Sequence, residues 1–495
     1  MQVIASEDLY SVAEFDEENI IAGMQGASGG AGDMSRYLSS ETGLAKRRAG
    51  SFDAAEEGEE VGEGGAAAAG GAGTSGTGVD PRLIGASKRK LSDATLQLWA
   101  GAAIATSGLS LKLQRLVSPE AWSFDVFEYD VACSMLPEPG TGKTATLLCY
   151  YLLEQHGIID SMKLDRVKVL AWLTKIDDGY IRSNPYHNSL HAADVCATVD
   201  YFLRQPNLAR HLSNVDVLAV LISALVHDMG HLGVNNTFLE ATKHELAVTY
   251  NDVSVLENHH VAAAFKLLKL KELDWTKTMD HDDYKDLRET VIQMVLGTDM
   301  RSHFEHLTKF KSKLAGDGFA NANLERKDTR LLMTMALHAA DISNPAKPQP
   351  IATAWARRSM EEFFRQGDRE LDLGIPVSPF MDRSKVPLAA TIVNCQIGFI
   401  NVLVRPLLSE WAAFLGPEAE RDIIVTLEAT LRLWETSGAK VIDSWGDFAS
   451  ANRNTPASAE PAAPTKKGSS KMLAAAERKT DPGMSSQRAN LQQRV

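Results

Sequence analysis

The feature that most constrains the fold is a long stretch of apolar residues at helical spacing. The pattern recurs between about Ala121 and Ser450, in segments such as LDRVKVLAWLTKI, VDVLAVLISALVH and HHVAAAFKLLKL. Apolar residues three and four positions apart form one face of an α-helix, whereas a half-buried strand alternates strictly, and no such run is present. The main expected interruption is ELDLGIPVSPFMDRSKVPL, with its prolines and glycine. The sequence therefore predicts an all-α, compact multi-helix domain.

The two ends of the chain differ from this region in composition. Residues 1–112 include EEGEEVGEGGAAAAGGAGTSGTG, and residues 451–495 are rich in Pro, Ala, Ser, Lys and Gln. Such segments bury too little apolar surface to offset the entropy of an ordered chain. We therefore predict a folded domain over residues 113–450 between two disordered tails. In the first tail, the basic residues of RKLS suggest Ser92 as a site for a basophilic kinase.

Composition also narrows the classes of partner and compartment. The 495 residues have a formal net charge of -13, which repels a phosphate backbone, so nucleic acid is not an expected partner. The acidic start, MQVIASEDLYSVAEFDEEN, predicts no signal peptide, and the apolar stretch at 217–226 is too short for a transmembrane segment. The cysteines form no C-x-x-C pair, which excludes a zinc ribbon and favours reduced thiols in a cytoplasmic protein. They are Cys133, Cys149, Cys196 and Cys395.

Histidine is scarce, with 13 in the chain, yet several fall in four short motifs. The motifs are YHNSLHAAD at 186–194, VHDMGH at 226–231, ENHH at 257–260 and LHAADISNP at 337–345. The first places His187 and His191 four residues apart, on one face of a helix. In the second and fourth, His227, Asp228 and Asp341 end strongly apolar helices. An ionised carboxylate in that setting is costly unless it is paired or bound to a metal.

Each motif alone has an ordinary interpretation as a hydrogen-bonded core histidine, but the combination points to a metal site. Imidazole nitrogen with carboxylate oxygen suits zinc, and carboxylate with several waters suits magnesium or manganese. A shared aspartate can bridge two ions about 4 Å apart and hold a hydroxide between them. The predicted metal ligands are His191, His227, Asp228 and Asp341.

Two other motifs invite functional interpretations that their residues do not support. The segment GTGKT at 140–144 is similar to a P-loop, but the glycine that such a loop needs five residues before Gly142 is Pro137. We expect a loop there, leading into a helix at Leu147. The charged run MEEFFRQGDRE at 360–370 is expected to be mostly a solvated helix face.

Seven motifs, in order, resemble those of the class I 3′,5′-cyclic nucleotide phosphodiesterases, which belong to the HD metallohydrolase superfamily. The motifs are YHNSLHAADV, LVHDMGHLGVNN, YNDVSVLENHH, LGTDM, HAADISNPAKP, EEFFRQGDRE and QIGFI. The resemblance runs from about Trp122 to Trp445 and so covers the predicted folded region. It implies an HD-type phosphodiesterase catalytic domain that hydrolyses a 3′,5′-cyclic nucleotide to the 5′-monophosphate in cyclic nucleotide signalling.

The resemblance also implies roles for matching residues. The four ligands above would hold Zn²⁺, and Asp228 would bridge to a second ion, Mg²⁺ or Mn²⁺, with a hydroxide between them that attacks phosphorus. His187 would be the general acid that protonates the leaving ribose 3′ oxygen. Glu257 would hold the tautomer of His187 and raise its proton affinity. His231 and Asp299 would surround the metal ligands.

The base pocket implied by the resemblance consists of Tyr186, Asn344, Gln396 and Phe399. Gln396 would hydrogen-bond the purine, and Phe399 would stack on it. Asn344 matches the cAMP-preferring members, because an amide can satisfy both N6-H and N7 of adenine. Ser359 stands where the family usually has a branched aliphatic residue, which loosens the pocket. We therefore expect cAMP to be favoured, with cGMP left open.

Two alternatives compete with this hypothesis. A different HD-type metal-dependent phosphohydrolase would share the metal ligands but would not need Gln396, Phe399, or the pair of His187 and Glu257. A non-enzymatic cyclic nucleotide binding protein would lack a metal ligand or the acid. Every one of these residues is present in the sequence, which favours hydrolysis.

Overall fold

The computed structural model describes residues 122–446, except for 136–141, 317, 322 and 386. Every regular element in this part of the chain is helical, which confirms the all-α prediction. The two predicted tails, the domain boundaries at 112/113 and 450/451, and Ser92 lie outside the described residues and stay predictions.

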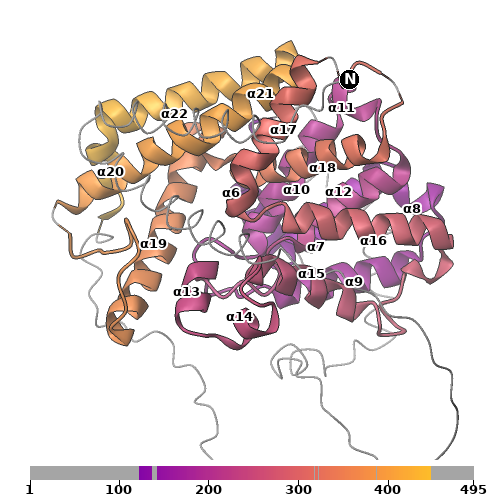
Figure 1. Ribbon diagram of the computed structural model, residues 1–495, viewed down its shortest axis with the longest axis horizontal. Helices are drawn as coiled ribbons and strands as arrows, with labels where there is room; N and C mark the ends of the chain where they lie inside the picture. Colours follow the sequence, from indigo (N-terminus) through magenta and orange to yellow (C-terminus); the bar gives the residue numbers. More distant parts are fainter. Residues whose placement is uncertain (1–121, 136–141, 317, 322, 386, 447–495) are drawn as a thin grey trace, which may run out of the picture. The chain divides into compact units, whose positions relative to one another are not determined.

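The elements follow one another along the chain as shown in Figure 1. The first group is α6 (Val126–Ser134), α7 (Thr144–Gln155), α8 (Ile158–Ser161), α9 (Arg166–Gly179), α10 (Ser189–Leu203), α11 (Pro206–Ala209), α12 (Asn214–Val226), α13 (Asn236–Ala241), α14 (Glu245–Thr249), α15 (Val255–Leu267) and η2 (Thr276–Thr278). The second group is α16 (His281–Leu296), η3 (Met300–Ser302), α17 (His303–Ala315), α18 (Arg326–Asp341), η4 (Asn344–Ala346), α19 (Gln349–Leu373), α20 (Leu388–Phe399), η5 (Ile400–Val404), α21 (Arg405–Leu415) and α22 (Pro417–Asp443).

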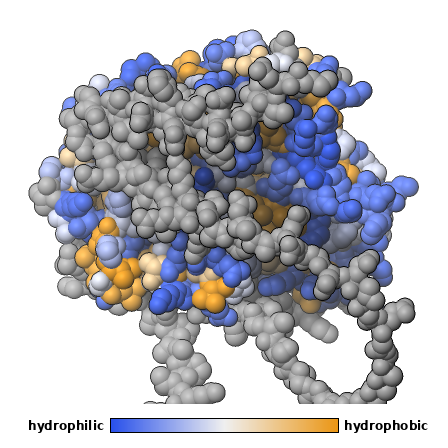
Figure 2. Space-filling view, in the orientation of Figure 1, coloured by the Kyte–Doolittle hydropathy of each residue, from blue (hydrophilic) through white to orange (hydrophobic). Residues whose placement is uncertain are grey.

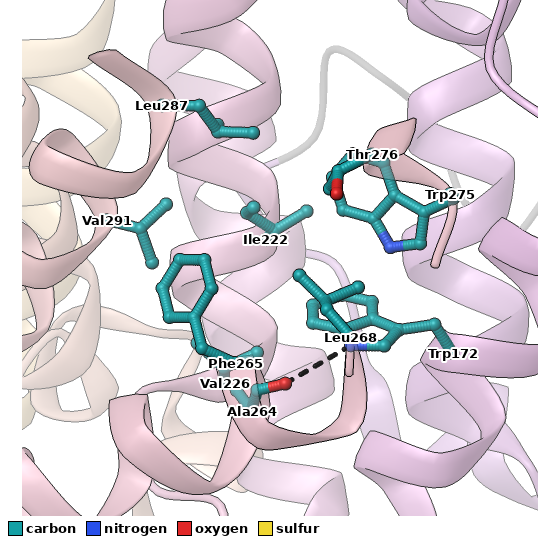
Figure 3. Close-up of a pocket in the computed structure, with 10 residues that line it drawn as sticks. All are labelled: Trp172, Ile222, Val226, Ala264, Phe265, Leu268, Trp275, Thr276, Leu287 and Val291. Atoms are coloured by element: carbon teal, nitrogen blue, oxygen red, sulfur yellow. Dashed lines mark hydrogen bonds between the residues drawn. The ribbon is translucent and has the colours of Figure 1, made fainter. Parts of the chain in front are cut away.

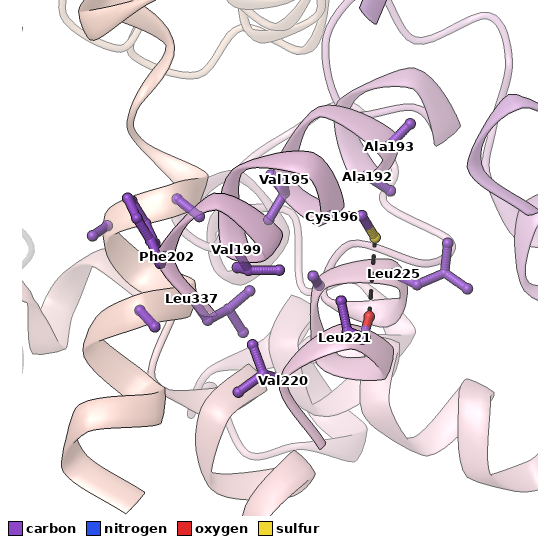
Figure 4. Close-up of a cluster of buried hydrophobic side chains, with 14 of the residues drawn as sticks. Ala192, Ala193, Val195, Cys196, Val199, Phe202, Val220, Leu221, Leu225 and Leu337 are labelled. Atoms are coloured by element: carbon purple, nitrogen blue, oxygen red, sulfur yellow. Dashed lines mark hydrogen bonds between the residues drawn. The ribbon is translucent and has the colours of Figure 1, made fainter. Parts of the chain in front are cut away.

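Helix α12 lies at the centre of the main core because nearly all of its sequence is apolar. Ser213 and Asp216 form a capping box at its start, and every side chain from 218 to 226 is buried. It packs against α7, α10, α16 and α18. Figure 4 shows this core, in which Leu221 of α12 and Leu337 of α18 lie beside Val199 of α10. A helix that is apolar on all sides has to be surrounded, and this places its C-terminal end inside the molecule.

The helices α20 and α21, joined by the π-helical turn η5, form one continuous run, Leu388–Leu415, beside α22 (Figure 1). Among the described residues, this run alone is long and apolar enough to cross a membrane by length and composition, with a mean hydropathy of 1.5. It also packs against α17 and α18, and Trp411 is fully buried. Of its most apolar window, 33% is buried inside the protein.

The expected interruption after the long helix α19 starts later than the sequence predicts. The helix continues to Leu373 and ends at Gly374, whose φ of +69° favours glycine. The non-helical segment that follows returns against α19. At Gly367, a Cβ atom would lie 1.9 Å from the carbonyl oxygen of Met381, so only glycine permits this approach.

Helix α7 is the helix expected after the GTGKT segment. It begins at Thr144, three residues before the expected Leu147, and Lys143 is its N-cap residue. Lys143 forms an ion pair with Asp178, so its ammonium group is engaged within the protein. Residues 140 and 141 lie outside the described residues.

A smaller hydrophobic core lies under α13, α14 and the start of α15. It consists of Val234, Phe238, Leu239, Ala247, Val255 and Leu256. On the face shown in Figure 2, the described surface is mainly hydrophilic, and the apolar residues form separate areas. The main core positions the ends of α10, α12 and α18, which carry three of the histidine motifs. The smaller core holds the start of α15, which carries the ENHH motif.

Candidate metal centre and active site

Four predicted metal ligands come together where three core helices meet. His191 lies in α10, His227 and Asp228 follow α12 directly, and Asp341 is the last residue of α18. One donor atom from each lies within 4.8 Å of the others. The Nε2 atoms of His191 and His227 are 3.3 Å apart, and Nε2 of His191 lies 3.0 Å from Oδ1 of Asp341.

The local structure presents these side chains as ligands. The ring of His227 uses Nδ1 to donate to the carbonyl oxygen of Ala224 at 2.9 Å, which leaves Nε2 as the acceptor atom facing the cluster. The chain then turns sharply at Gly230, where φ is +80° and a Cβ atom would lie 3.1 Å from Nε2 of His259. A glycine is needed at this turn because another residue would be strained and would crowd the histidine.

The pKa values in the cluster show that its two carboxylates carry negative charge although they are buried. Burial by itself raises the pKa of Asp228 and of Asp341. The charge of His227, together with the charges and hydrogen bonds of neighbouring histidines, outweighs burial and holds both pKa values well below the ordinary one. The same interaction raises the pKa of His227 against the effect of its burial. The two carboxylates thus need positive charge close by, which protons on the imidazoles or a bound cation would supply.

The distances in the cluster fit a tetrahedral metal site. Zinc bonds of about 2.1 Å to nitrogen and oxygen place neighbouring donor atoms about 3.4 Å apart. Nε2 of His227 lies 3.2 Å from Oδ2 of Asp228 and 3.4 Å from Oδ1 of Asp341. These residues therefore form a group that could hold a divalent ion.

The partner of His187 differs from the one expected from the sequence. Glu362 of α19, rather than Glu257, forms a hydrogen bond with Nδ1 of His187 through Oε1. Its other oxygen accepts from the backbone N–H groups of Tyr186 and His187, each at 3.0 Å. The prediction that Glu257 orients His187 is therefore wrong in its geometry.

Glu257 has a different environment. Its carboxyl group accepts from Nδ2 of Asn236 at 3.0 Å. Burial, followed by the negative charge of Asp299, raises the pKa of Glu257 to about 8. A carboxyl group that is mostly neutral at pH 7 would also be a weak partner for an imidazolium ion.

Glu362 lies in the charged run at 360–370, and its role was not predicted from the sequence. We expected most of this run to be a solvated face, but Glu362 is only 4% exposed. It lies seven residues after the buried Trp355, and this spacing places both on the same face of α19. The burial of Glu362 could have been predicted from this seven-residue spacing. His260 was also missed: its Nδ1 donates to the carbonyl oxygen of Met229, and its Nε2 lies 3.7 Å from Oδ1 of Asp228.

His231 and Asp299, the two residues expected around the metal ligands, have different neighbours. The ring of His231 stacks on that of His187 with centroids 3.9 Å apart. Burial, followed by the charge of His187, lowers the pKa of His231 to about 4. Asp299 caps η3 by accepting from the backbone N–H of Arg301 at 3.0 Å, and it also accepts from Oγ of Ser254 at 2.7 Å.

The residues expected in the base pocket form two pairs. The hydroxyl group of Tyr186 donates to Oδ1 of Asn344, which is buried. Gln396 and Phe399 lie three residues apart near the end of α20. The amide of Gln396 is 6% exposed and has no hydrogen bond to another described residue, so it is available to a ligand. Ser359 points its hydroxyl group back to the carbonyl oxygen of Ala356 at 3.0 Å.

A pocket elsewhere in the helical core has no chemistry of this kind. Figure 3 shows it between α9, α12, α15 and α16, with Trp172, Phe265 and Trp275 in its wall. The indole N–H of Trp172 donates to the carbonyl oxygen of Ala264 at 3.3 Å, and the lining is almost entirely apolar. Titratable side chains are absent from this lining among the described residues, which leaves the histidine cluster as the candidate active site.

Comparisons with known proteins agree with the motifs. The profile of the family "3'5'-cyclic nucleotide phosphodiesterase" matches residues 186–424. The structure is similar to a crystal structure of the phosphodiesterase domain of the RhoPDE fusion protein from the choanoflagellate Salpingoeca rosetta. The two have a TM-score of 0.58 and 30% sequence identity, over 67% of this chain and 99% of the other. The chain belongs to the 3′,5′-cyclic nucleotide phosphodiesterase family.

Curated relatives are similar to this chain over about three fifths of its length. The dual specificity calcium/calmodulin-dependent 3',5'-cyclic nucleotide phosphodiesterase 1B of Bos taurus is 38% identical over 298 residues, which cover 60% of this chain and 52% of the relative. The 3',5'-cyclic-AMP phosphodiesterase, isoform F, of Drosophila melanogaster is 36% identical over 314 residues, which cover 62% and 46%. The chain thus spans about half the length of these curated relatives.

Proposed function

We propose that this chain hydrolyses 3′,5′-cyclic nucleotides to 5′-nucleoside monophosphates in cyclic nucleotide signalling. The observation that carries the proposal is the convergence of two imidazoles and two carboxylates within 4.8 Å, beside the paired His187 and Glu362. A cyclic phosphodiester gathers negative charge on its oxygens in the transition state, and it also needs a proton for the departing ribose oxygen. The two groups of residues meet these two needs. Family membership supports the same reaction.

We assign the tight metal site to His191, His227, Asp228 and Asp341. Nitrogen together with oxygen donors favours Zn²⁺ there. We infer that Asp228 is shared with a second ion, Mg²⁺ or Mn²⁺, because its Oδ2 faces His227 while its Oδ1 faces His260. When bound, such ions would supply Lewis-acid charge that activates water and neutralises the phosphate.

We assign the general acid role to His187. Burial alone would lower its pKa, but Glu362 and then Asp228 outweigh this effect and raise the pKa to about 9. At neutral pH the imidazole is therefore protonated, with Nδ1 held by Glu362 and Nε2 left to donate. A proton at this nitrogen can pass to the 3′ oxygen of ribose as it leaves.

We assign base recognition to Tyr186, Asn344, Gln396 and Phe399. The free amide of Gln396 suits either purine, because it can present a donor or an acceptor. We favour cAMP and leave cGMP open, and the two relatives above are named for dual specificity and for cyclic AMP. His231 and Asp299 would support the site from outside the ligand shell.

The two alternatives have specific weaknesses. A different HD-type phosphohydrolase would not need the amide of Gln396 on α20, which has no hydrogen bond to another described residue. A binding protein without activity would not need the hydrogen bond between His187 and Glu362. We also favour a cytoplasmic location, supported by the four cysteines, which are all free and buried.

Hydrolysis of cAMP and cGMP by the full chain, with divalent metal added or chelated, tests the proposal. Wild type should hydrolyse at least one nucleotide with metal, and Asp228→Asn should lower kcat by about a hundredfold or more, since a ligand of both ions is weakened. Added Zn²⁺ should raise the unfolding temperature of wild type more than that of Asp228→Asn. Asp177→Asn is a matched control, because Asp177 is a buried aspartate that hydrogen-bonds Thr146 of α7. Activity that survives chelation would contradict the mechanism.

A further inference from the structure

A chain of hydrogen bonds runs from the protein interior to the proposed base pocket. It starts at Asp194 of α10, which is 1% exposed. Nδ2 of Asn344, in η4, donates to Oδ2 of Asp194 at 3.0 Å. The hydroxyl group of Tyr186, just before α10, donates to Oδ1 of Asn344. The three residues therefore connect a buried carboxylate to a residue that packs on the candidate active site.

A buried lysine stabilises the inner end of this chain. Lys347 is 1% exposed and its ammonium group lies 4.2 Å from the ring centroid of Trp122. Burial raises the pKa of Asp194, and among the charges that oppose this effect that of Lys347 is the largest. Burial likewise lowers the pKa of Lys347, and the negative charge of Asp194 opposes this effect.

The chemistry of each group fixes the direction of the next hydrogen bond. A carboxylate can only accept, so the amide of Asn344 has to turn its NH₂ group toward Asp194 and its carbonyl oxygen toward Tyr186. The carbonyl oxygen also only accepts, so the hydroxyl group of Tyr186 has to donate to it. Once its proton is used in this way, the oxygen of Tyr186 offers only lone pairs to a ligand.

We propose that Asp194, held beside Lys347, sets the nucleobase preference of this site by fixing the orientations of Asn344 and Tyr186. An outer acceptor suits the amino group at C6 of adenine and disfavours the carbonyl oxygen at C6 of guanine. Gln396 lacks a hydrogen bond to any other described residue, so its amide can turn to suit either base. Asp194 is a positioning residue, and the inference rests on the function proposed above.

The ring of Tyr186 is held in place by three neighbouring rings of the candidate active site. Its ring lies 4.7 Å from the rings of both His187 and His191, between centroids, and 5.4 Å from that of Trp355. These contacts leave the ring little freedom, so the direction of its hydroxyl group is the remaining variable. That direction is decided by Asn344, and the orientation of Asn344 is decided by Asp194.

The test measures kcat/KM for cAMP and for cGMP in the metal-loaded full chain and in three variants. Asp194→Asn replaces a group that only accepts by an amide that can donate or accept, so the amide of Asn344 is free to turn. This variant leaves Lys347 without a buried counter-charge, so the double variant Asp194→Asn/Lys347→Met removes both charges together. Tyr186→Phe keeps the ring and removes only the oxygen. Asp177→Asn again serves as the control.

Wild type should prefer cAMP, and the ratio of kcat/KM for cAMP over cGMP should fall at least tenfold in all three test variants. The control should keep the wild-type ratio. A merely structural role for Asp194 would lower both activities together and leave the ratio unchanged. An unchanged ratio in the double variant, or in Tyr186→Phe if the double variant does not fold, overturns the inference, as does a wild type that prefers cGMP. If wild type hydrolyses neither nucleotide, the proposed function fails and the inference fails with it.

Discussion

At the scale of single residues, the candidate site depends on buried charges that are paired with one another. Glu362 accepts three hydrogen bonds from Tyr186 and His187. Burial raises the pKa of Glu362, but the charge of His187 and these hydrogen bonds lower it to about 2. A carboxylate in this position is almost always ionised, so it stabilises the protonated form of His187. Removing its charge while keeping its shape should therefore affect proton transfer more than binding.

We predict that Glu362→Gln lowers kcat roughly a hundredfold to ten-thousandfold, the range that a general acid contributes, with a smaller change in KM. The adjacent Glu361 gives a matched control, because it is partly exposed and pairs with Arg365 at 2.9 Å outside the site. Glu361→Gln should keep nearly wild-type kcat. Steady-state kinetics on cAMP measure both. A larger loss in Glu257→Gln than in Glu362→Gln would favour the partner expected from the sequence.

At the scale of elements, α19 holds together segments that are distant in sequence. Gln366 donates to Oδ1 of Asn235 at 3.0 Å, ahead of α13, and to Oε1 of Glu370 at 2.8 Å. Glu370 in turn accepts from the backbone N–H of Ser378 at 2.6 Å, in the segment that follows the helix. With Glu362 these residues form a polar row at four-residue spacing, so one face of α19 supports both the active site and two loops.

We predict that Gly367→Ala destabilises the fold by about 1–3 kcal/mol, which is the usual range for overpacking. Helix propensity alone predicts the opposite sign, a gain of about 0.5–1 kcal/mol. The new methyl group would lie 1.9 Å from the backbone oxygen of Met381, which cannot rotate away. Urea unfolding measures the change. Gly316→Ala is the control, because its methyl group would lie 3.6 Å from the nearest atom, the backbone oxygen of Ser312. Equal stability of Gly367→Ala and wild type would contradict the prediction.

At the scale of the whole molecule, two buried histidines connect helices outside the candidate metal site. Nδ1 of His303 in α17 lies 2.9 Å from Nε2 of His338 in α18, and both side chains are fully buried. Burial, followed by the charge of the other histidine, lowers the pKa of His303 to about 3. Burial lowers the pKa of His338 to about 4. The folded state therefore favours the neutral form of both rings.

We predict that the fold loses stability as the pH falls below about 6.5, the ordinary pKa of an unfolded histidine. A lowered pKa in the fold means that the unfolded chain binds the proton first, so stability is complete above that pH and decreases below it. At pH 5 each ring contributes a loss on the order of 2 kcal/mol. Urea unfolding at pH 7.5 and 5.0 measures it. His303→Asn should reduce this pH dependence, and replacement of the exposed His281 should not. Equal dependence in both variants would contradict the prediction.

The sequence by itself determined the helical class, and it named the four residues that the structure brings together as a candidate metal site. Apolar spacing is a local property, so it specified helices such as α12 without knowledge of their neighbours. His191, His227, Asp228 and Asp341 were recognisable because they follow or interrupt strongly apolar segments, where charge needs compensation. The matching motifs also indicated the family, which the comparisons show.

Only the tertiary structure decided which groups meet across the site. Glu257 and Glu362 are the same residue type, and the sequence does not say which of α15 and α19 faces His187. The pairing of His187 with Glu362 spans 175 residues, and that of Asn344 with Asp194 spans 150. Helical periodicity fixes the face on which a side chain lies, but the helix opposite that face is set by the packing of the whole core.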